Sequence, residues 1–308
     1  MNIEEKIEIV KKLAEEIITE KELIELFEKK KNPVAYDGFE PSGLAHLPFG
    51  VFRPILLKEF QRIGIKFKLL IADSFAWINN KMGGDIDKIR KVGEYFIEVW
   101  KAAGVENVEY VWALDFFDDR EYCKKVILIA KNTTIKRARR ALTIMGRKEG
   151  ELKEVAQYFY PMMQVADVFQ LDVDICQLGL DQRRANILAR EIAEKLGWKK
   201  PIIISHHMLM SIEGVKTPEG FDENKARDIQ ISSKMSKSKP NTCIFVHDSK
   251  EELRKKILSA FCPPRQVEGN PILEYCKYII FKKFDSMKIE RESKYGGSLA
   301  VSYTHLTL

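Results

Sequence analysis

The chain has 308 residues, a mass of 35.7 kDa and a hydrophobic content of 45%, enough to bury an α/β core and one small further domain. Its longest apolar runs, such as residues 69–72 and 126–130, fall far short of the ~18 residues that a membrane helix needs, which excludes a membrane protein. Lysine and arginine exceed aspartate and glutamate only by 51 to 45, and the net charge of +6 permits a nucleic-acid partner without demonstrating one.

The first predicted element is a surface helix over residues 1–30. Glutamate and lysine alternate there around apolar residues at helical spacing, which are Ile3, Ile7, Val10, Leu13 and Ile17. The segment lacks the apolar core of a signal peptide.

The five cysteines are odd in number, widely spaced and without a Cys-x-x-Cys pair. We therefore expect a cytoplasmic protein with reduced thiols and no structural metal.

Strands and helices are predicted to alternate over the next two hundred or so residues. Short apolar or β-branched runs predict strands at 34–38, 66–73, 108–113, 173–178 and 201–205. Helical patterns lie between them at 49–63, 86–103, 120–145 and 181–196, and Gly64, Gly104 and Gly197 follow three of these as helix caps. This alternation predicts an α/β fold with a doubly wound parallel sheet.

The pattern changes after residue 245. Charged helices are expected at 249–260 and 271–284, separated by Cys262-Pro263-Pro264, and no further alternating strands follow. We therefore predict one domain over residues 1–245 and a second, helical one over 246–308. Residues 298–308 have no charged side chain unless His305 is protonated, in a chain that is 31% charged, so we expect them to be a non-native tail.

The first nucleotide-binding signal follows the first predicted strand. It runs Asp37-Gly38-Phe39-Glu40-Pro41-Ser42-Gly43, then His46-Leu47-Pro48-Phe49-Gly50, and leads into a helix. Glycine lets a backbone approach a ligand, and proline suits a first helical turn. The start of a helix attracts anions such as the ATP phosphates, with His46 beside them as a donor. Alone, this pattern could equally be an ordinary turn.

The second signal is Ser232-Ser233-Lys234-Met235-Ser236-Lys237-Ser238. Two ammonium groups on a loop can stabilise the charge that develops on pyrophosphate when the α–β bond of ATP breaks. A cluster of serine and lysine is more often a solvated loop. The upstream histidine and helix in an α/β frame favour the functional interpretation.

These residues resemble the signatures of class I aminoacyl-tRNA synthetases. Lys234 to Ser238 match the KMSKS signature, and His46 to Phe49 occupy the place of HIGH, keeping its first histidine and lacking the second. Residues 30–297 resemble archaeal and eukaryotic-type tyrosyl-tRNA synthetases through YDGFEPSG, NNKMGGD, YPMMQVAD, LDQR and SSKMSKS. The resemblance implies a Rossmann-like catalytic domain with a helical insertion at about 117–165, and an incomplete C-terminal helical anticodon-binding domain.

A tyrosine pocket is expected around one helix. Tyr160, Gln164 and Asp167 are spaced i, i+4 and i+7, so they share one helical face, although an amphipathic helix with a polar edge has the same spacing. The resemblance implies that Tyr160, Gln164 and Gln182 contact the α-amino group of tyrosine, and that Tyr36 and Asp167 hydrogen-bond its phenol. A tryptophan-specific relative is the nearest competitor, but an indole offers only an N–H donor, which suits Tyr36 and Asp167 less well.

The resemblance also implies the reaction and its partners. L-Tyrosine and ATP, with Mg²⁺, would give tyrosyl-adenylate and pyrophosphate, and tyrosine would pass to tRNA(Tyr). His46, Lys234 and Lys237 would be the catalytic residues. The expected ATP-binding residues are Gly38, Glu40, His46, Gly50, Lys234, Met235, Ser236 and Lys237.

A basic run predicts contact with tRNA phosphates. Its members are Lys136, Arg137, Arg139 and Arg140, although such runs are more often a solvated face. The family implies a homodimer.

Asp73, at the end of the second predicted strand, could face a ligand, but we favour a helix N-cap. A non-catalytic RNA-binding protein on the same fold is the alternative of another class; Tyr36, Asp167 and the two lysines argue against it.

Overall fold

The structure is a computed structural model that describes residues 1–147 and 149–306. The chain forms two compact units, of which unit 1 comprises Met1–Gly43 and Leu56–His207, and unit 2 comprises Leu44–Ile55 and Met208–Leu308. These units are defined by how densely their residues contact one another. The domains expected at 1–245 and 246–308 have other boundaries and stay a prediction.

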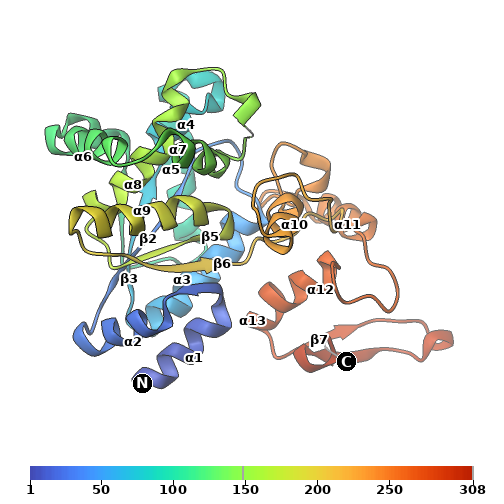
Figure 1. The fold of residues 1–308 in the computed structure, drawn as a ribbon. Helices are drawn as coiled ribbons and strands as arrows, with labels where there is room; N and C mark the ends of the chain where they lie inside the picture. The colour runs from blue at the N-terminus through green and yellow to red at the C-terminus, as the bar shows by residue number, and fades with distance from the viewer. Residues whose placement is uncertain (148, 307–308) are drawn as a thin grey trace. The chain divides into compact units, whose positions relative to one another are not determined.

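Unit 1 is built on a six-stranded sheet with the order β1-β6-β5-β2-β3-β4 (Figure 1). Its parallel strands are β2 (Val34–Phe39), β3 (Lys66–Ile71), β4 (Val108–Trp112), β5 (Ile175–Gly179) and β6 (Ile202–His206). β5 and β6 are buried along their whole length, which explains why they appear in the sequence as continuous apolar runs. The predicted α/β fold with a parallel sheet is confirmed.

The N-terminal helix expected over residues 1–30 is wrong as a single element. The segment forms α1 (Ile3–Leu13), β1 (Ala14–Ile18) and α2 (Glu20–Lys29). β1 runs antiparallel to β6, so the sheet is mixed. The edge of β6 offers backbone partners that the apolar spacing of the segment does not reveal, and Thr19 starts α2 with a capping box to Glu22.

Helices flank the sheet of unit 1 (Figure 1). They are most of α3 (Arg53–Arg62), then α4 (Asp73–Ile78), α5 (Ile86–Ala102), α6 (Arg120–Lys131), α7 (Ile135–Ala141), α8 (Tyr160–Gln170) and α9 (Arg183–Leu196). The single helix expected at 120–145 is interrupted, because Asn132 closes α6 and the Thr134 side chain caps α7. Gly197 ends α9 with φ of 66°, a left-handed conformation that suits glycine.

The described residues of unit 2 form helices and a hairpin. The helices are α10 (Lys225–Ser233), α11 (Lys250–Ser259) and α12 (Pro271–Tyr275), the last continuing through a π-helical turn into α13 (Phe281–Lys283). The expectation of no strands after residue 245 is wrong, because β7 (Ser286–Ile289) pairs antiparallel with β8 (Leu299–Ser302). Each strand is only four residues long, too short for a clear alternation in the sequence. Residues 299–302, expected to be part of a non-native tail, therefore form a strand.

No helix within residues 1–147 or 149–306 has the length and apolar character needed to cross a membrane.

Candidate active site

The centre of unit 1 holds a buried tyrosine and a buried aspartate that lack full sets of partners. Tyr36 lies on β2, which pairs with β3 on one side and β5 on the other, and its side chain is 1% exposed. Asp167 lies on α8 and is fully buried. Among the described residues, neither the Tyr36 Oη nor the Asp167 Oδ2 has a hydrogen-bond partner. Buried polar atoms without partners are costly, so both can accommodate a polar ligand.

The other oxygen of Asp167 is held by Tyr122 of α6. The Tyr122 Oη donates to Asp167 Oδ1 at 2.8 Å. Burial raises the pKa of Asp167 to about 8, and the hydrogen bond from Tyr122 acts in the opposite direction. Burial also raises the pKa of Tyr36 well above its ordinary range, and the nearby Cys176 and Asp167 raise this pKa further. The Gln164 side chain acts on the pKa in the opposite direction. Tyr36 is therefore a neutral hydroxyl that can donate.

A second polar group continues along the same helix. The Tyr160 Oη donates to Glu40 Oε1 at 2.6 Å, and the Tyr160 ring lies edge-on to Phe75 with centroids 4.7 Å apart. The Gln164 Nε2 donates to Gln182 Oε1 at 3.1 Å, and the Gln182 Nε2 donates to the Ile144 carbonyl at 3.1 Å. The structure therefore brings together the residues predicted to bind the α-amino group, on α8 and on the turn before α9.

Glu40, which follows β2, is held by Asn79 and Lys81, for which the sequence predicts no role. The Asn79 Nδ2 donates to both Glu40 carboxylate oxygens at 3.1 and 3.3 Å, and the Lys81 Nζ lies 3.7 Å from Glu40 Oε2. Asn79 and Lys81 belong to the NNKMGGD motif, so that motif was the available signal. Tyr122 gave no such signal, because its spacing to Val126 and Ile129 is that of a core-facing helix residue.

Asp73 anchors the ends of neighbouring elements in unit 1. Its carboxylate accepts hydrogen bonds from the backbone N–H groups of Leu114 and Ser74, at 2.7 and 3.0 Å, and lies 3.4 Å from Arg90. Burial raises the pKa of this carboxyl group, against the effect of those hydrogen bonds. The favoured N-cap role is wrong, because Ala72 is the N-cap of α4 and Asp73 is its first helical residue.

The His46 segment in unit 2 is fixed by backbone hydrogen bonds. His46 pairs with Phe245 in an isolated antiparallel bridge, and the Leu47 N–H donates to the Ile244 carbonyl at 2.8 Å. The chain then enters a π-helical turn, Pro48–Phe52, where the Gly50 N–H donates to the His46 carbonyl at 2.8 Å. This turn continues directly into α3, which begins at Arg53.

The loop at Lys234 to Lys237 belongs to the same unit and has a buried anchor. Lys234 is the C-cap of α10 and forms an isolated antiparallel β-bridge with Met210. The next residue, Met235, is 3% exposed. The Met235 N–H donates to the Leu209 carbonyl at 2.8 Å, whereas the Ser236 hydroxyl lies 2.9 Å from that of Ser238. A buried methionine thus fixes the loop between two half-exposed lysines.

Unit 2 concentrates positive charge around His46. Desolvation lowers the pKa of His46 well below its ordinary range, and the charges of Lys237, Arg53 and Lys234 lower it further. The imidazole is therefore neutral at pH 7. Among the described groups none hydrogen-bonds to the His46 Nδ1, which is buried. A neutral histidine beside three cations is suited to an anionic ligand, because the negative charge would offset the repulsion among the three cations.

The predicted ATP-binding residues divide between the units. Gly38, on β2, and Glu40 belong to unit 1, and the others, which are His46, Gly50, Lys234, Met235, Ser236 and Lys237, belong to unit 2. Residues 1–147 and 149–306 contain no group of three or more His, Cys, Asp or Glu side chains that could hold a metal ion.

The basic residues of α7 do not all face solvent. Lys136, Arg139 and Arg140 are exposed. Arg137 is half-buried, and its Nε lies 2.8 Å from Glu191 of α9 while its Nη2 donates to the Arg184 carbonyl at 3.2 Å. Arg137 is therefore engaged within unit 1.

Residues 28–300 match the model of a family described as tRNA synthetases class I (W and Y). The cytoplasmic tyrosine–tRNA ligase 1 of Arabidopsis thaliana is 46% identical over 301 residues, which cover 96% of this chain and 74% of the relative. A tyrosyl-tRNA synthetase from Pyrococcus horikoshii, solved with L-tyrosine, is 38% identical with a TM-score of 0.88, covering 99% of this chain and 88% of that one. Leishmania major tyrosyl-tRNA synthetase, solved with tyrosinol, is 35% identical with a TM-score of 0.85, and this chain spans only 45% of its length.

Proposed function

Because the chain belongs to the class I tRNA synthetases, and within them to the tyrosine–tRNA ligases, we propose that Tyr36 and Asp167 recognise the phenol of its substrate. A tyrosine–tRNA ligase makes tyrosyl-tRNA from tyrosine and ATP. Tyrosine, ATP and tRNA are therefore the partners that family membership assigns to this chain.

The observation that carries the phenol site is the pair of buried atoms without partners, Tyr36 Oη and Asp167 Oδ2. A phenol group both donates and accepts a hydrogen bond, so it would donate to Asp167 and accept from Tyr36. Phenylalanine would leave both atoms unpaired, and the indole of tryptophan would leave Tyr36 unpaired. Rejection of an analogue that lacks a bonded hydroxyl is a principle for which tyrosine-specific synthetases are themselves a standard example.

The α-amino group of tyrosine would bind at the next turn of α8. The Gln164 Nε2 already donates a hydrogen bond to Gln182, and the Gln164 Oε1 can accept one from an ammonium group. The Tyr160 hydroxyl, which donates to Glu40, keeps its own lone pairs as acceptors. Glu40 adds a negative charge next to this hydroxyl. We therefore propose that Tyr160, Gln164 and Gln182 orient the amino end of the substrate.

We propose that His46, Lys234 and Lys237 bind the phosphates of ATP, with Gly38, Glu40, Gly50, Met235 and Ser236 in the surrounding nucleotide site. The tyrosine carboxylate would attack the α-phosphorus in line, the bond from that phosphorus to the bridging oxygen would break, and pyrophosphate would leave. Lysine ammonium groups would stabilise the charge on the leaving pyrophosphate. Mg²⁺ would arrive with ATP, mainly held by its phosphates. The ribose hydroxyl of tRNA would then displace AMP from tyrosyl-adenylate.

The first test is tyrosine-dependent ATP–pyrophosphate exchange, with phenylalanine and tryptophan as alternatives. We expect exchange with tyrosine only. Lys234→Ala should lower kcat by about a hundredfold, because a donor to developing charge is lost. Tyr36→Phe should raise KM for tyrosine by about tenfold, because the phenol oxygen loses a donor.

The exposed Lys239 provides the matched control for the lysine variant. Lys239→Ala should exchange at the parent rate, because this residue follows the Lys234 to Lys237 loop in the chain and has no proposed contact with the phosphates. Folded parent protein that shows no exchange with tyrosine would favour a non-catalytic RNA-binding protein on the same fold. Equal kcat values for the Lys234 and Lys239 variants would remove Lys234 from the catalytic residues.

We further propose that the chain acts as a homodimer in the cytoplasm and contacts tRNA through α7. Exposed apolar side chains in the segment from α6 to α8 support an interface, among them Ile127, Ile135 and Val155. The exposed Lys136, Arg139 and Arg140 suit the acceptor-stem phosphates. Arg137 belongs to the same basic run, but its ion pair with Glu191 makes it the least suited of the four to bind a phosphate. The cytoplasmic location is proposed because the Arabidopsis relative is named as a cytoplasmic enzyme.

A further inference from the structure

A short strip of unit 2, residues 243–246, touches both segments assigned to the ATP phosphates. The Ile244 carbonyl accepts a hydrogen bond from the Leu47 N–H at 2.8 Å, next to His46. The Ile244 N–H approaches the Met235 Sδ at 3.4 Å, within the lysine loop. The two backbone groups of one residue thus connect the His46 segment with the Lys234 to Lys237 loop.

The pairing of this strip with the His46 segment extends over neighbouring residues. Phe245 forms the antiparallel bridge to His46, and the Val246 N–H donates to the Ala45 carbonyl at 3.1 Å. A displacement of the strip would therefore displace His46, because its backbone is bonded on both sides of the imidazole.

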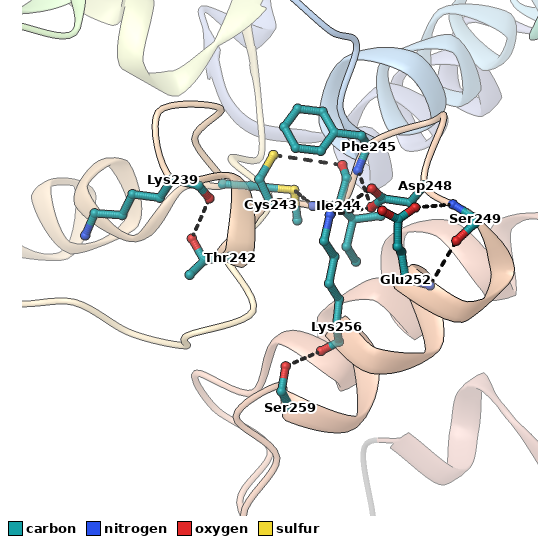
Figure 2. Close-up of polar contacts among 11 residues, drawn as sticks. Lys239, Thr242, Cys243, Ile244, Phe245, Asp248, Ser249, Glu252, Lys256 and Ser259 are labelled. Atoms are coloured by element: carbon teal, nitrogen blue, oxygen red, sulfur yellow. Dashed lines mark hydrogen bonds and ion pairs between the residues drawn. The ribbon is translucent and has the colours of Figure 1, made fainter.

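An ion pair fixes the far end of the strip (Figure 2). The Asp248 Oδ2 accepts from the Phe245 N–H at 2.8 Å and lies 2.6 Å from the Lys256 Nζ. The same ammonium group lies 2.8 Å from Asp248 Oδ1 and 5.0 Å from the centroid of the Phe245 ring. The side chains of Lys256 and Asp248 are only 16% and 10% exposed. Solvent screens such a pair less than it screens a surface pair.

The pair is attached to a regular element. Ser249, which follows Asp248, is the N-cap of α11 and forms a reciprocal capping box with Glu252, and Lys256 lies further along the same helix (Figure 2). The helix therefore holds the ammonium group at a defined distance from the strip. A group held on a helix is positioned more accurately than one held by a loop.

We propose that Asp248 and Lys256 are positioning residues for adenylate formation: their ion pair holds the 243–246 strip and, through it, His46 and the Lys234 to Lys237 loop. The inference rests on the proposed role of those three side chains at the phosphates. Neither Asp248 nor Lys256 needs to touch the substrate. A displacement of catalytic groups by about 1 Å can cost up to ~100-fold in rate, so a group that sets their position affects the reaction strongly.

The test uses the full chain and variants that separate charge from packing. Lys256→Met keeps an apolar stem against Phe245 and removes the ammonium group, and Asp248→Asn keeps an acceptor for the Phe245 N–H. Each should lower kcat/KM for ATP in pyrophosphate exchange by about tenfold to a hundredfold. The double variant should lose no more than the worse single one. Lys256→Arg should recover most of the loss, and Lys255→Met, at the exposed neighbour on α11, should match the parent.

Tyrosine affinity, measured by equilibrium dialysis, should stay at the parent value in every variant, because the pocket residues of unit 1 are unchanged. A parallel fall in tyrosine affinity and in kcat/KM for ATP would indicate a general loss of structure and overturn the positioning role. Equal kcat/KM values for the Lys256→Met and Lys255→Met variants would also overturn it.

A second measurement needs no activity. The imidazole of His46 is titrated by NMR, where its pKa is depressed by desolvation and by Lys237, Arg53 and Lys234. Lys256→Met should move this pKa back toward the ordinary range, and Lys255→Met should not. Absence of exchange in the parent would refute the proposed function alone, since the titration still decides whether the pair holds His46 in place.

Discussion

Asp167 is a buried carboxyl group whose pKa of about 8 lies far above its unfolded value, because it is fully buried and only one of its oxygens has a partner. The folded state therefore binds more protons than the unfolded state between about pH 4 and pH 8. We predict that, without tyrosine, the free energy of unfolding falls as the pH rises through this range, by up to about 1.4 kcal/mol per pH unit. Asp167→Asn should abolish this part of the slope. Urea denaturation followed by tryptophan fluorescence measures it, because all four tryptophans lie in unit 1.

Asp174 is the matched control at the same scale. Its pKa is lowered, against the effect of burial, by Lys199, Lys30 and the Val34 N–H. The stability that it contributes is fully present above its unfolded pKa and is lost only as the pH falls through its lower folded pKa. Asp174→Asn should thus shift the unfolding curve without changing its slope between about pH 5 and pH 7. If the Asp167→Asn variant keeps the parent slope, the carboxyl group is ionised in the free pocket.

At the scale of elements, α7 is a helix with two different faces. Arg137 contacts α9 through Glu191, whereas Lys136, Arg139 and Arg140 are exposed. We predict that alanine at each exposed position weakens tRNA binding and lowers the slope of log K against log salt by about 0.7 to 0.9, because one phosphate contact is lost. Filter binding over a range of salt concentrations measures both quantities.

The control for α7 is Lys101, an exposed lysine at the end of α5 that pairs with Glu98. Lys101→Ala should leave the salt slope unchanged, since Lys101 lies on α5 and is not part of α7. A uniform effect of all four substitutions would mean that net charge alone attracts the tRNA, and α7 would lose its assigned role.

At the scale of the whole molecule, the proposed homodimer should have twice the chain mass of 35.7 kDa in sedimentation equilibrium. Ile135 and Val155 are exposed by 79% and 77%, and an interface would bury them. Glutamate at either position should shift the mass toward that of one chain, because a charge would be desolvated on association. Val267→Glu, at an exposed position of unit 2, is the control. A parent mass of 35.7 kDa at all concentrations would contradict the dimer.

The sequence by itself determined the parallel part of the sheet and the family. Strands buried on both faces, such as β5 and β6, are short apolar runs bounded by helical patterns, and these properties are local. The spacing of Tyr160, Gln164 and Asp167 places them on one helical face, and the motifs around Lys234 and His46 identified the class I synthetases. The roles of these residues remain predictions that the exchange assays address.

Only the tertiary structure decided which distant groups meet. β1 became an edge strand because β6 offered it backbone partners, and β7 and β8 formed because each is the partner of the other. Tyr122 had the spacing of a core residue until its hydroxyl met Asp167, more than forty residues away. The link from Lys256 through Asp248 to the strip beside His46 depends likewise on contacts across the chain. Periodicity specifies which face of an element is buried, whereas the partner on that face is set by the packing of the whole unit.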